Sequence, residues 1–347
     1  MATQTMKEAF AEIGPDFSFA PFGVILQPLI IEVLLELGLH TFRKNTILMP
    51  KLLMWFILML TIRRDLCYNQ LLNWMVSAFR WFKDILPAKN KILADGAITR
   101  ASIKFGLEPF RLLFYKLRAT LGKLPTDFYD WTSVGFDGST ASMPEGCENE
   151  KHFKKPSSRN GYSAFPKRRM IVLQVLSLHL ILDIDYAPSI LKKTGERTLM
   201  MNILGRVFNF VDSPLLFLMD AGLYSFGALL EISKAGHDLI AKVSSNMKLS
   251  PIKYLPDGSY LAIVVGQIED LESPPRKDGQ KRWHLIGISV RVIIIQVPGY
   301  PPRRLITTIL DPNITAREIA GHLIQDGKLK SLMMKLRPIN VLLGEVN

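Results

Sequence analysis

Two short apolar segments, each with a carboxylate near a glycine, constrain the fold of this chain more than any other feature. The first, Val134–Thr140, delivers Asp137 directly before Gly138, where we expect the chain to turn; the second, Pro214–Asp220, is apolar up to its final acid. A buried strand that ends in a carboxylate and turns into a helix is typical of sheets that hold such acids at one edge. We therefore predict a mixed α+β or α/β fold with both acids at neighbouring strand ends.

The two acids have more than one interpretation. Taken singly, each is explained more simply as the Asp that caps a turn after a strand. Two acids in the same pattern on a basic chain favour a shared site for Mg²⁺ or Mn²⁺, which would position a water or hydroxyl for displacement at a phosphate. The prediction is a nuclease-like site with Asp137 and Asp220 as catalytic residues and metal ligands.

The charge of the chain indicates its class of partner. Among 347 residues, 43 Lys and Arg face 31 Asp and Glu, which gives a net charge of +12 and a pI near 9.6. Such an excess favours nucleic acid or an anionic membrane, although a solvated basic surface explains it equally well. Between the two acids, residues 151–169 interleave cations with aromatic residues, which suits contact with phosphates and bases. The candidate DNA-binding residues are Lys154, Lys155, Arg159, Lys167, Arg168 and Arg169.

Cysteine content and hydropathy bear on the compartment. Cys67 and Cys147 form neither a metal-ligand spacing nor a disulfide framework, which fits a reducing compartment. No signal peptide is visible at the N-terminus. Ile47–Ile62 is apolar, but Pro50 and Lys51 interrupt it, and its unbroken run is about half of the ~20 residues that a membrane span needs. We expect a buried helix and no membrane partner; a membrane-surface protein using this segment is the remaining alternative.

Changes of periodicity divide the chain into regions. Residues 1–125 have helical spacing, and their last two expected helices, joined by a glycine turn, could lie against DNA. Residues 126–236 alternate strands and helices around the two acids. Residues 237–312 are rich in β-branched residues separated by turns. Residues 313–347 begin with a further helix.

Motifs along nearly the whole chain resemble the insertion-sequence-four family of DDE transposases, which are bacterial mobile-element enzymes. Each motif is modest alone, and their order makes them specific. Ala221 stands where the family commonly has Arg. The motifs are Arg63–Tyr68, Asp95–Leu117, Phe136–Thr140, Gly161–Pro166, Leu216–Ser225, Lys242–Asn246 and Leu255–Tyr260.

The resemblance implies an RNase H-like catalytic core at 126–236, a β-rich insertion domain at 237–312 and a DNA-binding N-terminal domain at 1–125. Asp137 and Asp220 would be the first two catalytic acids, with Mg²⁺ or Mn²⁺ as the cofactor. The implied activity is hydrolysis of a phosphodiester at the element end and strand transfer to target DNA. Implied partners are the terminal inverted repeats, target DNA and, in intact family members, a second subunit, in the bacterial cytoplasm with the nucleoid.

The third catalytic acid of the family is expected on a helix with the pattern Tyr-x2-Arg-x3-Glu-x6-Lys after Ile319. The chain instead reads Gly321–Pro338 without that pattern, and Glu345 is the only Glu that follows. The departure leaves two of the three acids. We therefore expect 313–347 to contain the start of the third-acid helix followed by a tail unrelated to the family, with catalysis abolished or severely impaired.

We hypothesise that a frameshift near His322 produced this departure. When Leu323–Val341 is back-translated with permitted codons and read two positions later, the sequence contains Arg-x3-Glu-x6-Lys. One missing base after His322 would produce the change, and the lost Glu would fall between Leu329 and Lys330. The alternative to an enzyme is a non-catalytic DNA-binding remnant that inhibits an intact transposase by occupying its DNA ends.

Overall fold

The computed structural model describes residues 20–39, 49–78, 95–158, 161–190, 195–269, 283–295 and 302–325. The chain divides into two compact units, one within residues 1–122 and one within residues 123–333. Each unit has its own core of buried apolar side chains. The predicted domain limits at 125, 236 and 312 stay predictions.

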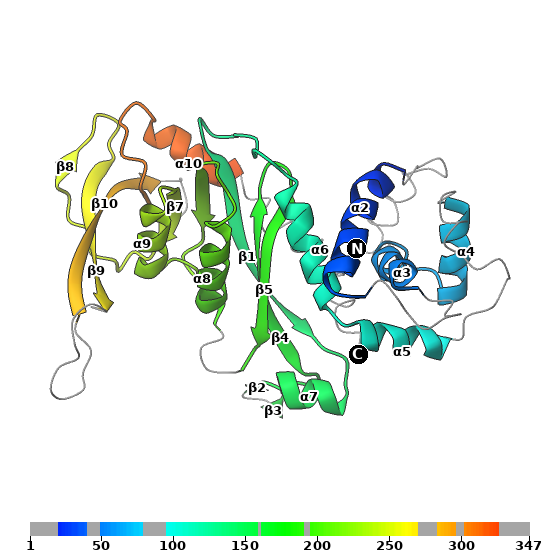
Figure 1. Cartoon of the computed structure of the whole chain (residues 1–347). Coiled ribbons are helices and arrows are strands. Elements are labelled where there is room, and N and C mark those ends of the chain that lie inside the picture. Colours follow the sequence, from blue (N-terminus) through cyan, green and yellow to red (C-terminus); the bar gives the residue numbers. More distant parts are fainter. Residues whose placement is uncertain are drawn as a thin grey trace. The chain divides into compact units, whose positions relative to one another are not determined.

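The first unit is helical in its described residues, and a central helix carries its core. Leu52–Phe56 are fully buried there, and Pro50 occupies the first turn, where its missing N–H leaves no hydrogen bond unmade. This confirms the predicted buried helix. Every helix in the described ranges is too short or too polar for a membrane span. The helices are α2 (Ala20–Glu36), α3 (Pro50–Ile62), α4 (Tyr68–Ala78), α5 (Asp95–Phe105) and α6 (Glu108–Ala119) (Figure 1).

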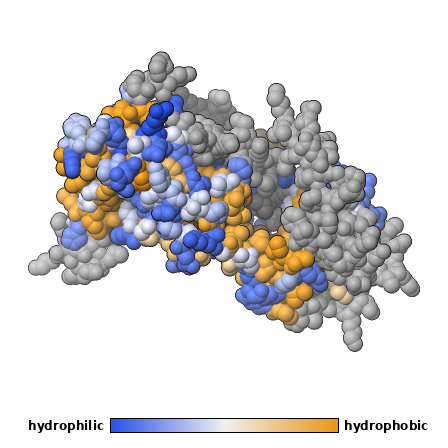
Figure 2. Space-filling view, turned by 90° about the horizontal axis from the view of Figure 1, so that it is seen from above, coloured by the Kyte–Doolittle hydropathy of each residue, from blue (hydrophilic) through white to orange (hydrophobic). Residues whose placement is uncertain are grey.

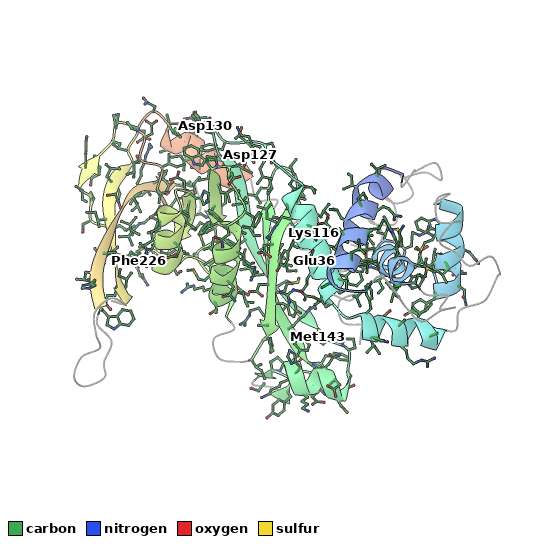
Figure 3. All side chains as sticks on the ribbon, in the orientation of Figure 1. Glu36, Lys116, Asp127, Asp130, Met143 and Phe226 are labelled. Atoms are coloured by element: carbon green, nitrogen blue, oxygen red, sulfur yellow. The ribbon has the colours of Figure 1, made fainter. Side chains whose placement is uncertain are left out.

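Two local features hold the end of this unit together. Gly106 has a φ of +72° between α5 and α6, a conformation that favours glycine, and it forms the predicted turn. The Lys116 ammonium on α6 lies 2.6 Å from the Glu32 carboxylate and 2.8 Å from that of Glu36 on α2. Figure 3 shows Lys116 beside Glu36. These ion pairs fasten α6 to α2.

The second unit is built on one mixed sheet that contains nine strands in the described residues. Its strand order is β5-β4-β1-β6-β7-β11-β10-β9-β8, in which β1, β6 and β7 are parallel neighbours and the other pairs are antiparallel (Figure 1). The strands are β1 (Thr132–Ser142), β4 (Lys167–Val175), β5 (Leu180–Pro188), β6 (Leu215–Met219), β7 (Asp238–Val243), β8 (Lys253–Tyr254), β9 (Tyr260–Glu269), β10 (Trp283–Ile295) and β11 (Arg303–Thr307). A short separate hairpin is formed by β2 (Ser157–Ser158) and β3 (Gly161–Tyr162).

Helices cover both faces of this sheet. Because side chains alternate along a strand, Phe136 and Phe217 share one face, where they stack, and Phe208 at the end of α8 packs edge-on against Phe217. Leu216 and Leu218 point to the other face and pack with side chains of α10. The helices are α7 (Cys147–Phe153), α8 (Glu196–Val207), α9 (Phe226–Lys234) and α10 (Ala316–Gln325). The prediction of a mixed α/β fold is confirmed.

The region predicted as a β-rich insertion is continuous with this sheet. β7 pairs with β6, and β11, β10, β9 and β8 follow in order, so that the strands of 237–312 extend the sheet. Phe226 at the start of α9 packs over this extension, since a Cβ on Gly266 of β9 would lie 2.1 Å from its ring. Figure 2 shows hydrophobic surface at the end of the molecule where β8, β9 and β10 lie, and Ile263, Val265 and Leu285 are exposed there.

The structure corrects the prediction that the chain turns at Gly138. β1 continues to Ser142, because β4 pairs with it along its whole second half, from Gly138 opposite Ile171 to Ser142 opposite Lys167. Gly138 has a packing role instead: a Cβ there would lie 2.9 Å from the carboxylate carbon of Glu196. The sequence could not show this, because strand length is set by the partner strand.

Candidate functional site

Asp137 and Asp220 lie on neighbouring strands at one edge of the parallel part of the sheet. β1 and β6 pair with Val134 opposite Phe217 and Gly135 opposite Leu218. The pairing ends there. Two residues farther along each segment lie Asp137, still within β1, and Asp220, the first residue after β6. Strand alternation assigns both acids to the face that carries Leu216 and Leu218, the face covered by α10. The fold thus brings together the two acids that the sequence singled out.

Asp137 has an environment that disfavours its charge. Burial, opposed in part by a hydrogen bond from the Gly138 backbone N–H and reinforced by the charge of Glu196, raises the pKa of Asp137 to about 6. A divalent cation would reverse this preference by stabilising the carboxylate. Oxygen donors of this kind are those that Mg²⁺ and Mn²⁺ prefer, so the acids fit the predicted ions.

Asp220 differs from Asp137 in being exposed. Its side chain is 64% accessible, and its carboxylate lies 3.3 Å from the Lys242 ammonium. Lys242 belongs to β7, the next strand of the sheet, whose register places it beside Asp220. The turn that follows Asp220 is the predicted one: the N–H groups of Leu223 and Tyr224 donate to the Asp220 carbonyl at 3.0 and 3.2 Å. An exposed ion pair is weak, so Asp220 stays available to a ligand.

The start of α8 supports this edge from the opposite face. Glu196, its first residue, packs its carboxylate against Gly138 and lies 3.9 Å from Arg169. Arg197 donates to the Gly222 carbonyl at 3.0 Å and so holds the turn after Asp220. Glu196 and Lys242 were not predicted as neighbours of the site. An acid at the start of a helix does not indicate which part of the sheet the helix packs against. In the described part of the chain, no group of three His, Cys, Asp or Glu residues lies close enough to form a metal site.

The segment that interleaves cations with aromatic residues, 151–169, joins the sheet at the far end of β1 and β4 from Asp137. Ser142 pairs with Lys167 and Asp137 with Val172, so Lys167 lies five residues beyond Asp137, about 17 Å along the strand. Lys154 and two aromatic residues, Tyr162 and Phe165, are exposed, with Tyr162 at 79%. Exposed aromatic and basic side chains in one segment suit contact with the bases and phosphates of a nucleic acid.

Three of the predicted DNA-binding cations have other contacts. The Lys155 ammonium lies 2.9 Å from Glu145, and Arg169 approaches Glu196. Arg168 is only 4% exposed, lies over the Tyr186 ring at 5.9 Å, and its Nε and Nη2 have no hydrogen-bond partner in the described structure. Arg159 lies outside the described residues. The site assignments of all six cations stay predictions.

α10 reaches the start of β1 on the face of the two acids. The Tyr129 hydroxyl donates to Glu318 at 2.8 Å, and His322 Nε2 lies 2.6 Å from the Ser133 hydroxyl. The His322 ring also stacks on Phe128 at 4.3 Å. Burial lowers the pKa of His322, opposed by the charge of Asp127, which lies at this end of the sheet (Figure 3). The last described turn of α10 therefore contacts β1 four residues before Asp137.

Comparisons with known proteins bear on both units. The comparison with curated proteins gave no match. Among solved structures, a piggyBac transposase in a cryo-EM synaptic complex with hairpin DNA is similar with a TM-score of 0.43 and 10% identity, over 90% of this chain and 65% of that chain. A Bacillus subtilis endonuclease V crystal structure is similar with a TM-score of 0.26 and 12% identity, over 66% of this chain and 94% of that one. This chain thus spans about 65% of the length of the piggyBac transposase chain that it matches.

The family comparison concerns the helical unit. Residues 22–115 match the family described as the insertion element 4 transposase N-terminal domain. This range contains α3 to α5 complete, almost all of α2 and the first two thirds of α6. It agrees with the family that the sequence motifs predicted. Within residues 22–115, the chain is therefore similar to the N-terminal domain of insertion element 4 transposases.

Proposed function

We propose that the second unit is the catalytic core of a DNA transposase, in which Asp137 and Asp220 bind Mg²⁺ or Mn²⁺. The observation that carries the proposal is the parallel pairing of β1 and β6, which supports a position of the two acids on neighbouring segments at one edge of the sheet. The order β5-β4-β1-β6-β7, with β1 antiparallel to β4 and parallel to β6, supports an RNase H-like core. The family match over residues 22–115 supports DNA as the substrate.

In this proposal the acids, the cations and the aromatic residues have different roles. Asp137 and Asp220 hold the metal at the sheet edge, and the metal supplies charge stabilisation to a phosphodiester under attack. Exposed Lys154 and the aromatic residues of the loop contact DNA that leads to this edge. Lys242 pairs with Asp220 in the metal-free protein, and its half-exposed ammonium would be available to a phosphate if a metal held the carboxylate instead. The reaction is hydrolysis at the element end followed by strand transfer.

The third acid of the reaction is proposed to lie outside this reading frame. Ser133, where α10 contacts β1, lies four residues before Asp137, about 13 Å along the strand. A helix that continued toward Asp137 would cover this length in about nine residues after His322. The frameshift places the lost Glu between Leu329 and Lys330, close to that position. Sequencing the gene tests the frameshift, which is wrong if no reading frame continues the family helix after codon 322.

A second candidate function is a non-catalytic remnant that binds transposon ends. Its support is the pattern missing after Ile319, together with the match of residues 22–115 to a transposase N-terminal domain, which does not depend on the two acids. Such a protein would compete with an intact transposase for the same DNA. Both candidates share DNA binding and differ in cleavage.

A cleavage assay on element-end DNA with Mn²⁺ tests the proposal. We expect the chain as it stands to bind DNA and to cleave it little or not at all, and a chain restored to the other frame after His322 to cleave it. Asp137→Asn should abolish that cleavage. Cleavage by the unrestored chain that Asp137→Asn abolishes would exclude the remnant. Equal cleavage by the restored chain and its Asp137→Asn variant would refute the proposed site.

A further inference from the structure

A buried arginine joins the extended part of the sheet to the start of α10. Arg291 on β10 is completely buried, and every nitrogen of its guanidinium is engaged. Nε donates to the Ser259 hydroxyl at 2.8 Å, and Nη1 donates to the carbonyls of Asp311 and Ile314 at 2.9 and 2.7 Å. Nη2 donates to the Asp257 carboxylate. Two of these acceptors lie in the segment that leads directly into α10.

Asp257 also forms a hydrogen bond with the first residue of α10. Its Oδ2 accepts the backbone N–H of Ala316, the first residue of α10, at 2.7 Å. Its Oδ1 accepts the backbone N–H and the hydroxyl of Ser259 at 3.1 and 2.6 Å. Although burial acts in the opposite direction, these hydrogen bonds and the Arg291 charge lower the pKa of Asp257 to about 2. The first N–H groups of a helix have no partner within it, so an acid from the turn between β8 and β9 supplies one here.

The helix start has a second, local cap. The N–H of Thr315 donates to the Glu318 carboxylate at 2.8 Å, and the N–H of Glu318 donates to the Thr315 hydroxyl at 3.3 Å. This reciprocal arrangement is a capping box, which stabilises a helix wherever it lies. Asp257 adds what a local cap cannot provide, because it fixes the helix start to a particular place on the sheet.

We infer that Asp257 and Arg291 are positioning residues that fix the start of α10 and thereby hold it across the face that carries Asp137 and Asp220. At its other end α10 touches β1 through His322 and Ser133. A helix attached at both ends has a defined direction on the sheet, and the proposed third-acid helix would need such a direction. The consequence for catalysis rests on the proposed function; the attachment of α10 does not.

The other role for such a pair would be to stabilise the ribbon of β9 and β10 only. Buried ion pairs are often replaceable by apolar residues with no loss of stability, so burial alone does not favour positioning. The three bonds that involve Asp311, Ile314 and Ala316 do favour it, because they leave the ribbon and end at the start of α10 or in the segment that leads into it. The two roles predict different local effects.

Hydrogen–deuterium exchange of the full chain, without DNA or metal, separates the two roles. In Asp257→Asn we expect exchange of the α10 amides to rise at least tenfold, while the amides of β6 keep their protection. The imidazole signals of His322 should shift, and its pKa should rise toward the ordinary value, because the ring becomes less buried when α10 loosens. Asp183→Asn is the matched control, since Asp183 is a buried acid that pairs with Arg206 of α8 from β5, a strand at the other edge of the sheet from β8 and β9.

A second variant keeps the inference testable if Asp257→Asn does not fold. Ala316→Pro deletes only the N–H that Asp257 accepts, at the first helical position, where proline is tolerated. We expect a smaller rise in α10 exchange and the same direction of shift at His322. Unchanged α10 exchange in both folded variants, or an equal rise in α10 and β6, would overturn the inference. Failure here leaves the cleavage assay unaffected, so the two proposals can fail separately.

Discussion

Two carboxylates of the second unit, Asp220 and Asp257, each face a cation and illustrate opposite uses of an acid. The Asp257 carboxylate is bonded to the fully buried Arg291 and to backbone and hydroxyl donors that use all its acceptor capacity. The Asp220 carboxylate is exposed and has a single long contact with a half-exposed lysine. An acid whose bonds are all made is structural, whereas an acid with open coordination is available to a ligand. We call the contacts of Asp257 the closed junction, because its acceptors are all used, and the surroundings of Asp137 and Asp220 the open edge, because Asp220 can still bind a ligand.

The largest effect should come from breaking the closed junction. Arg291→Met would leave Asp257 without its cation, and the carbonyls of Asp311 and Ile314 without their donor. Removal of one partner of a buried pair costs about 3–5 kcal/mol of unfolding free energy. Urea unfolding measures this. A loss below about 1 kcal/mol would show that the junction tolerates an apolar side chain and that our comparison is wrong.

The pH dependence of the unfolding free energy should reveal the raised pKa of Asp137. The pKa of Asp137 is raised to about 6 in the folded protein. A raised carboxyl pKa stabilises the fold below the unfolded value, near pH 4, and this contribution is lost as pH rises to about 6. With allowance for solvent screening, the loss is on the order of 1–2 kcal/mol.

Comparison with Asp137→Asn isolates this effect. Urea unfolding at pH 4 and pH 7 should show that the wild-type protein weakens relative to the variant across this range. Addition of Mg²⁺ at pH 7 should restore wild-type stability and leave the variant unchanged. Parallel pH profiles for the two proteins would contradict a destabilised carboxylate at this edge.

A smaller effect is expected from the glycine beside Asp137. In Gly138→Ala, the new Cβ would lie 2.9–3.2 Å from the carboxylate atoms of Glu196 and would displace that flexible side chain. We expect a loss of about 1 kcal/mol and a lower pKa for Asp137, because the Glu196 charge moves away. NMR titration of the Asp137 carboxyl measures the second effect. An unchanged pKa would show that Glu196 does not act on the site.

The smallest effect on stability should come from the open ion pair. Lys242→Met removes an exposed contact with Asp220, which contributes about 0–1 kcal/mol. The same change should strengthen Mn²⁺ binding, because the competing ammonium is gone. Isothermal titration calorimetry measures this. Weaker Mn²⁺ binding in the variant would show that Lys242 assists the site instead of competing with the metal.

The sequence predicted the parts of the molecule whose signals are local. The apolar period of α3, the glycine between α5 and α6 and the apolar run before Asp220 each act over a few residues, and each was predicted correctly. The family motifs were also correct where the N-terminal domain match tests them.

Features that depend on distant partners could not be predicted in this way. The length of β1 depends on β4, and so Gly138 was wrongly assigned to a turn. The neighbours of Asp137 and Asp220, Glu196 and Lys242, come from another helix and another strand. In the sequence, Arg291 is one cation within an apolar segment. Its role could not be predicted, because its acceptors lie in segments that only the fold brings together. Register and docking decide these contacts, and neither is encoded in a local pattern.

Mn²⁺ binding to four forms of the protein tests the central claim, the metal site at the sheet edge, most directly. The forms are the wild type, Asp137→Asn, Asp220→Asn and Asp212→Asn, whose exposed acid lies before β6, at the other end of that strand. Titration followed by electron paramagnetic resonance should show that the wild type and Asp212→Asn bind alike. Each of the other two variants should bind at least tenfold more weakly. Equal binding by all four proteins would contradict a metal site formed by Asp137 and Asp220.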